Sequence, residues 1–288
     1  MDDSNMKVLE SRGFPPLLTE IPDAPKKLYY RGTLPDWSAY KFLCVVGARK
    51  YSSYGKEVCE RLIAGLAGYP VIIVSGLALG IDSIAHKAAL AAGLKTLVVP
   101  GSGLDWNVLY PASHARLAKD IIKAGGALLS EFEPNFKATP YAFPQRNRIM
   151  AGMSHAVLVV EAEIKSGTLI TSRLATEYNR DVLTVPGSIF SNGSSGPHML
   201  LRLGATPVTS PAELLDALGF KHEEKPIARD YTNCSVTEKI LLELLTQPLP
   251  RDKLIRKSGL SASEANATLS VLEIKGFVKE TMGEMRLV

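Results

Sequence analysis

Short apolar runs, each followed by a loop and a helical pattern, occupy the chain from Lys41 to about Leu218. Runs of Val, Ile and Leu bounded by turn residues are typical of strands buried on both faces of a parallel sheet. The helical segments between them fit right-handed βαβ crossovers. We therefore expect the α/β class, an extended Rossmann-like parallel sheet sandwich, with strands at 42–46, 71–74, 96–99, 127–129, 156–160 and 182–185.

The segments on either side of this pattern differ from it. Residues 1–40 are rich in Pro and lack a clear period, so we expect an extended lead-in. A Rossmann-like domain then covers 41–220, and the charged stretch 221–230 is expected to be a linker. From 231 to 288, three helical stretches and two strand-like stretches around Met282-Gly283 predict a small C-terminal winged-helix domain.

The composition, 46% hydrophobic and 22% charged, is that of a globular chain and excludes general disorder. A net charge of +4 permits an anionic partner without demonstrating one. Cys44, Cys59 and Cys234 form no CxxC pair, so we expect free thiols in a reducing cytoplasm. No apolar stretch is long enough to span a bilayer, and the histidines show no metal-ligand spacing. We expect no metal and no cofactor.

Candidate binding residues follow the strands, where ligands bind in open α/β sheets. After the first strand, Gly47 permits a tight turn, Arg49 offers a forked cation, and Ser52 lies at the start of the next helix, where anions bind. The loop lacks GxGxxG and GxxxxGK[ST], which argues against a dinucleotide or triphosphate site. We expect an anion site here; a tight turn with a solvated arginine is the alternative.

Two further strand ends carry similar residues. Ser75 and Gly76, after the second strand, allow close approach of a ligand, although close strand–helix packing explains them equally well. Asp82 is expected to cap the helix that follows. After the fifth strand, Lys165 precedes Ser166-Gly167-Thr168, which we expect to form the first turn of a helix with Ser166 as its N-cap and an anion-binding end.

The segment Phe143 to Arg148 combines an aromatic ring with cations. Phe143 offers a stacking platform, and Arg146, Asn147 and Arg148 offer phosphate contacts. The two arginines diverge by about 200° on a helix, so we expect one to bind ligand and the other to form an internal salt bridge. A core role for Phe143 is the rival interpretation.

Other polar and aromatic residues fit structural roles better. Glu131 and Glu133 follow the fourth strand and face opposite ways, so we expect structural or ion-pairing roles for them rather than a catalytic dyad. Trp106 and Tyr110 lie in a loop and are expected to cover the edge of the sheet.

These motifs together closely resemble the DNA-processing protein A (Smf) family. The resemblance covers Phe14 to Leu218 and keeps the order of seven segments, which makes it specific, and the winged helix is similar to a domain that many members carry. The matching segments are VVGARKYSSYG, SGLALGIDSIAH, PGSGLDWNVLYP, SEFEP, FPQRNRIMAGMSHAVLVVEA, SGTLITSRLA and VPGSI.

The resemblance implies a cytoplasmic bacterial protein of natural transformation, one that is not an enzyme. Such proteins act as homodimers, bind and protect incoming single-stranded DNA, and load the RecA recombinase onto it. The family's DNA pocket maps onto Arg49, Phe143, the pair Arg146 and Arg148, and the helix start Ser166 to Thr168 with Lys165. A basic residue expected shortly before Phe143 is not adjacent to it.

Two other functions compete with this one. Phosphoribohydrolases with related folds bind nucleoside monophosphates and carry a PGGxGTxxE signature, but Thr171 stands here where their catalytic glutamate is expected. A duplex-DNA regulator would act through the winged helix, yet that domain has 8 basic and 7 acidic residues from Tyr231 onward, too even a balance for strong duplex binding.

Overall fold

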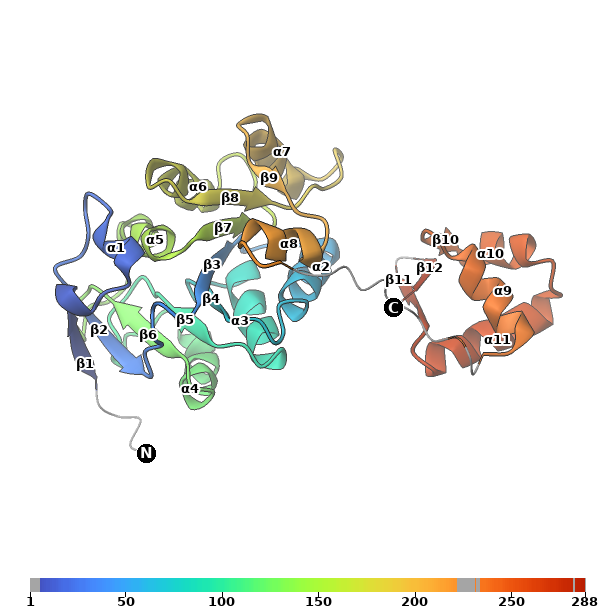
Figure 1. Ribbon diagram of the computed structural model, residues 1–288, viewed down its shortest axis with the longest axis horizontal. Helices are drawn as coiled ribbons and strands as arrows, with labels where there is room; N and C mark the ends of the chain where they lie inside the picture. Colours follow the sequence, from blue (N-terminus) through green and yellow to red (C-terminus); the bar gives the residue numbers. More distant parts are fainter. Residues whose placement is uncertain (1–5, 222–230, 232–233, 282, 288) are drawn as a thin grey trace. The chain divides into compact units, whose positions relative to one another are not determined.

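The computed structural model describes residues 6–221, 231, 234–281 and 283–287. The chain forms two compact units, residues 1–223 and residues 224–288 (Figure 1). Apart from Lys221, the stretch that we expected to be a linker lies outside the described residues.

The described part of the first unit is built on one nine-stranded sheet with the strand order β1-β2-β6-β5-β4-β3-β7-β8-β9. The strands from β6 to β9 in this order run parallel, with β3 at the centre. The strands are β1 (Lys7–Glu10), β2 (Lys27–Gly32), β3 (Lys41–Val46), β4 (Val71–Ser75), β5 (Thr96–Val98), β6 (Ala127–Ser130), β7 (Ala156–Val159), β8 (Asp181–Thr184) and β9 (Thr206–Pro207).

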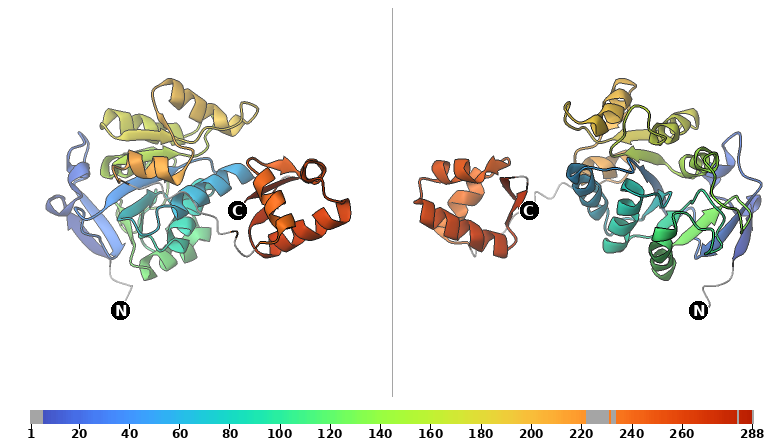
Figure 2. Two further views of the ribbon diagram at one scale, coloured as in Figure 1. Left: turned by 45° about the vertical axis from the view of Figure 1, so that its right-hand side comes forward. Right: turned by 180° about the vertical axis from the view of Figure 1, so that it is seen from behind.

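Helices cover both faces of this sheet (Figures 1 and 2). Helices α2, α3 and α8 pack on one face, and α1, α5 and α6 pack on the other. The helices are α1 (Pro16–Thr19), α2 (Ser53–Ala64), α3 (Ile81–Ala91), α4 (Ala115–Lys123), α5 (Ala142–Met153), α6 (Thr168–Glu177), α7 (Ser195–Arg202) and α8 (Pro211–Ala217). The expected α/β sandwich is confirmed.

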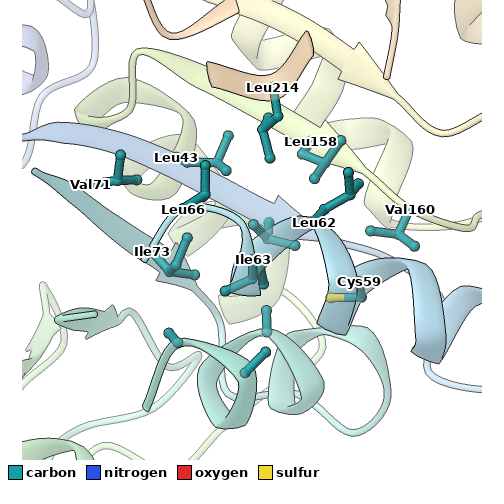
Figure 3. Packing of buried hydrophobic residues seen from close by; sticks show 14 of the residues in the cluster. Leu43, Cys59, Leu62, Ile63, Leu66, Val71, Ile73, Leu158, Val160 and Leu214 are labelled. Carbon is teal, nitrogen blue, oxygen red and sulfur yellow. The ribbon is translucent and has the colours of Figure 1, made fainter. Parts of the chain in front are cut away.

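Strand β3 shows why its residues form a central strand. Leu43 and Val45 pack against α2, α3 and α8, whereas Phe42, Cys44 and Val46 belong to the cluster on the opposite face. Figure 3 shows the first of these clusters, to which Leu43 belongs together with Leu62 and Ile63 of α2 and Leu214 of α8. Because successive side chains of a strand point to opposite faces, a strand covered on both sides must be apolar throughout.

The lead-in, which we expected to be extended, contributes two strands to the main sheet. Strand β2 pairs with β6 in antiparallel orientation, and β1 pairs with β2. Strand β2 carries the polar residues Lys27, Tyr29 and Arg31, whose partners come from distant loops. Glu133 binds Lys27 and the Tyr29 hydroxyl, and the Arg31 guanidinium donates to the carbonyl of Leu104. Because distant groups satisfy these polar residues, β2 lacks the continuous apolar run by which the other strands were predicted.

The described residues of the second unit form the expected winged helix. They contain α9 (Val236–Leu244), β10 (Leu249–Pro250), α10 (Arg251–Ser258), α11 (Ala262–Ile274), β11 (Val278–Thr281) and β12 (Glu284–Leu287). Ser235 and Glu238 form a capping box at α9, and the Ser261 hydroxyl accepts from the Glu264 amide at α11. Gly259, with φ of 69°, ends α10 in the left-handed conformation.

The three cysteines are free and buried, and burial raises the pKa of the Cys44 and Cys59 thiols. Within residues 6–221 and the described residues beyond them, no helix has the length and apolar character needed to cross a membrane.

Candidate nucleic-acid interface

Loops from several strands converge on one pocket at the carboxyl edge of the sheet. The pocket has a volume of about 460 Å³ and is formed by the loops after β3, β4 and β7 and by the start of α5. Nine of the residues expected from the sequence line it: Gly47, Arg49, Phe143, Arg146, Asn147, Lys165, Ser166, Gly167 and Thr168. Parallel strands place their carboxyl ends at one edge, which explains why residues more than a hundred positions apart meet here.

Three cations at this pocket are available to a ligand. Arg49, Lys50 and Lys165 are exposed, and none of them forms an ion pair with another described residue. The Arg49 guanidinium carbon lies 5.4 Å from the centre of the Phe143 ring, within cation–π range. The pocket therefore presents positive charge beside a half-buried aromatic ring.

Arg146 lines the same pocket but is committed to internal contacts. Its side chain is 6% exposed, forms an ion pair with Asp82 at 3.9 Å, and donates to the carbonyl of Val99 and to Oδ1 of Asn147. Burial raises the pKa of the Asp82 carboxyl, and the Arg146 guanidinium is the largest of the effects that oppose this rise. Arg146 and Asn147 therefore shape the floor of the pocket.

Gly76 supports this buried pair. A Cβ atom at Gly76 would lie 1.8 Å from Nη1 of Arg146, so a side chain there would collide with the guanidinium. The Gly76 amide also donates to Oδ2 of Asp82 at 3.1 Å. Gly76 does not line the pocket, and its lack of a side chain leaves room for the Arg146 guanidinium.

Arg148 lies outside the pocket lining, on another side of α5. Its guanidinium donates to Glu131 and to the carbonyl of Asp23, and it forms an ion pair with the Asp23 carboxylate at 3.5 Å. The sequence predicted that one of the two arginines of α5 would form an internal salt bridge, and in the structure both do. The predicted ion-pairing role of Glu131 is confirmed.

The two serines predicted for the site have structural partners instead. Ser52 caps α2 by accepting from the Gly55 amide, and its own amide donates to the buried carboxylate of Glu161 at 2.9 Å. Glu161 thus occupies the anion-binding end of α2 that we expected to be open. The Ser75 hydroxyl donates to the carbonyl of Val45 at 2.7 Å inside the core. Neither Ser52 nor Ser75 lines the pocket.

The start of α6 is tied to the loop after β3. Helix α6 begins at Thr168, so its N-cap is Gly167 rather than the expected Ser166. The Ser166 hydroxyl still accepts from the Thr168 amide at 3.2 Å. The Thr168 hydroxyl lies 3.0 Å from the Ser166 hydroxyl and donates to the carbonyl of Gly47 at 3.1 Å. The bond from Thr168 to Gly47 links the loop that carries Lys165 to the loop that carries Arg49.

Sequence reasoning missed two important residues of the pocket. Lys50 follows Arg49 and could have been found as a second cation at the same strand end. Asp82 was expected to cap α3, but α3 begins at Ile81 after Gly80, which puts Asp82 inside the first turn. Its partner Arg146 lies 64 positions further along the chain, and no local sequence pattern predicts an ion pair between residues so far apart.

A largely parallel Rossmann-like sheet with unpaired cations beside an aromatic ring at its strand ends is suited to an anionic ligand with planar rings, and a winged-helix unit follows in the same chain. Among the described residues, no group of His, Cys, Asp and Glu could hold a metal ion. These features define the class as an α/β protein with a cationic strand-end pocket and a winged helix.

The chain belongs to the family of DNA recombination-mediator protein A, whose model matches residues 5–219. Residues 234–284 match the DprA winged helix domain. Protein Smf of Escherichia coli is 38% identical over 282 residues, which cover 95% of this chain and 75% of that protein. The DNA processing protein DprA of Streptococcus pneumoniae is 45% identical over 203 residues, 70% of each chain.

Solved structures of two members of this family illustrate the similarity in fold. The X-ray structure of DprA from Streptococcus pneumoniae has a TM-score of 0.68 and 39% identity and covers 77% of each chain. A structure of DprA from Helicobacter pylori, described for its single-stranded DNA binding mode, has a TM-score of 0.66 and 30% identity, and it covers 74% of this chain and 95% of that one.

Proposed function

We propose that this chain binds single-stranded DNA at the strand-end pocket and acts as a mediator of DNA recombination. The observation that carries the proposal is the set of exposed cations Arg49, Lys50 and Lys165 around one pocket that also contains Phe143. Unpaired cations attract a phosphate backbone, and an aromatic ring offers a stacking face to a base of any sequence. Membership of the recombination-mediator family and the binding mode described for the Helicobacter pylori relative support this assignment.

The geometry favours a single strand over a duplex. A ring in the wall of a pocket contacts a base only when that base is turned out of a stack, which single strands allow at low cost. In helix-turn-helix proteins the recognition helix enters the major groove, and its counterpart here is α11. Helix α11 carries Glu264 and Glu273 but no Lys or Arg, so it offers no positive charge to a phosphate backbone.

The proposal extends to the finer steps that the family resemblance implies. The protein would protect incoming strands and load RecA onto them during natural transformation, in the cytoplasm, as a homodimer and without a catalytic step. The RecA step is tested on strands coated with single-strand-binding protein: adding this protein should shorten the lag in DNA-dependent ATP hydrolysis by RecA, and a lag of unchanged length would count against loading.

The binding step is tested by fluorescence anisotropy of a labelled thymine oligonucleotide at two salt concentrations. Arg49→Ala and Lys165→Ala should each weaken binding about tenfold and reduce the salt dependence by roughly 0.7 in the log–log slope, the value for one phosphate contact on a single strand. Lys87→Ala is the matched control, because Lys87 is exposed on α3 but does not line the pocket. Unchanged affinity in both pocket variants would remove the pocket from DNA binding.

A nucleotide-processing enzyme is the second candidate, and a separate assay of base release from a nucleoside monophosphate addresses it. Thr171, at the position of the expected catalytic glutamate, is a buried hydroxyl residue, and Asp82 is held by Arg146. Glu163 is the remaining carboxylate of the pocket lining and is exposed. Release of free base from a nucleoside monophosphate, lost in Glu163→Gln, would establish the enzyme and displace the DNA-binding proposal.

A further inference from the structure

The loop between β5 and α4, residues 99–111, has no part in the function proposed above, yet it contacts the aromatic ring of the pocket. A Cβ atom at Gly101 would lie 2.6 Å from Cδ1 of Phe143, so only glycine lets the ring lie against this loop. The ring centre of Tyr110 lies 5.6 Å from that of Phe143, with 55° between the two planes. This loop therefore brings a second aromatic ring beside the pocket.

Of these two rings, Tyr110 is the more accessible. Phe143 is half-buried, with the backbone of Gly101 against its edge and the Arg49 guanidinium 5.4 Å from its centre. Tyr110 is 45% exposed. We expected Tyr110 to cover the edge of the sheet, but nearly half of its surface faces solvent next to the pocket.

The position of Tyr110 is fixed by its neighbours. Its amide donates to the hydroxyl of the buried Ser102 at 3.1 Å. The carbonyl of Ser102 accepts from the Ser130 hydroxyl at 2.7 Å, which fastens the loop to the end of β6. The preceding residue, Leu109, is 3% exposed in the core under α4. A ring held by a fixed backbone loses little conformational entropy on contacting a ligand.

We propose that Tyr110 is a base-stacking residue that extends the DNA site beyond Phe143. The inference rests on the proposed function, because it takes single-stranded DNA as the ligand. The ring planes of Tyr110 and Phe143 differ by 55°, so their faces point in different directions. Two bases of the strand therefore stack on the two rings separately and are splayed apart. The phosphates of the same strand lie at Arg49 and Lys165.

The test compares Tyr110→Ala and Tyr110→Phe on thymine oligonucleotides and on abasic oligonucleotides of equal length. Tyr110→Ala should weaken binding to the thymine strand about tenfold, in the lower half of the range for one stacked base, with an unchanged salt slope. Tyr110→Phe should bind like the wild type. On the abasic strand all three proteins should bind equally, because no base is left to stack. Tyr40→Ala, a change immediately before β3 on the opposite edge of the sheet, controls for loss of a tyrosine.

Each contrary outcome has a distinct meaning. If Arg49→Ala weakens binding but Tyr110→Ala does not, the DNA site stands and Tyr110 is not part of it. If Tyr110→Ala weakens binding to abasic and thymine strands alike, its role is to shape the loop and the stacking proposal is wrong. If Tyr110→Ala does not fold, Tyr110→Leu keeps an apolar contact with Phe143 without an aromatic face, and wild-type affinity in that variant also overturns the proposal. Failure of the wild type to bind any strand rejects the proposed function itself.

Discussion

The substitution Gly76→Ala tests whether Gly76 and Arg146 act in the architecture of the pocket rather than on the ligand. The new Cβ would stand 1.8 Å from Nη1 of Arg146 and 2.2 Å from its Cζ. The guanidinium must therefore leave its place beside Asp82 and lose its hydrogen bond to the carbonyl of Val99. Overpacking of a core costs about 1–3 kcal/mol, and a hydrogen bond to a charged group contributes about 1.5–3 kcal/mol, so the free energy of unfolding should fall by about 3–5 kcal/mol.

Urea unfolding of four proteins measures this effect: the wild type, Gly76→Ala, Arg146→Ala and the double variant. In the Arg146→Ala background the methyl group has room, so Gly76→Ala should cost less than about 1 kcal/mol there. An equal cost of Gly76→Ala in both backgrounds would refute the reasoning, because the collision with Arg146 would then not be its cause. A midpoint shift at constant denaturant slope would show that stability alone has changed.

Two further predictions concern His86 and Arg148. Thr96 donates its hydroxyl proton to the carbonyl of Ile73 and so accepts from Nδ1 of His86, which leaves the buried Nε2 without a partner and the ring neutral. Burial lowers the pKa of His86 from 6.5 to about 3. Below pH 6.5 His86 is therefore protonated in the unfolded chain, while it stays neutral in the folded chain until the pH approaches 3. Protonation of the unfolded chain favours unfolding, so the stability of the fold is unaffected by His86 above pH 6.5 and decreases as the pH falls below that value. The free energy of unfolding should drop by about 2 kcal/mol between pH 7 and pH 5 through this residue, and urea titrations of His86→Gln should lack that part of the change. Arg148→Met leaves the carboxylate of Glu131 without its guanidinium and should lower stability by about 3 kcal/mol with DNA affinity unchanged in the anisotropy assay; weakened binding at unchanged stability would return Arg148 to the site.

The central strands could be predicted because their signal is local. Strands β3, β4 and β7 are covered on both faces, so nearly every residue must be apolar, and a glycine or polar loop marks where each ends. Strand β2 could not be found in this way, because its polar residues have distant partners, among them Glu133, Asp105 and the carbonyl of Leu104. Their suitability for a strand depends on groups about 70 to 106 positions away.

The pocket was predictable for a related reason. Parallel strands place their carboxyl ends together, so the loops with Arg49 and Lys165 had to meet once the fold class was known. What the sequence could not decide was which polar residues remain free for a ligand. Ser52, Arg146 and Arg148 have the same chemistry as residues that bind anions, and each is instead paired with a carboxylate from a distant element.

The sequence by itself thus determined the α/β class, the winged helix, the family and the edge of the sheet where the candidate site lies. These follow from local apolar runs, glycine turns and motif order, which need no knowledge of distant partners. Only the tertiary structure separated the exposed cations Arg49, Lys50 and Lys165 from the buried Arg146, and only it placed Tyr110 beside Phe143. The physical reason is that burial and pairing of a charge depend on side chains far away in the sequence, and these decide whether that charge is available to a ligand.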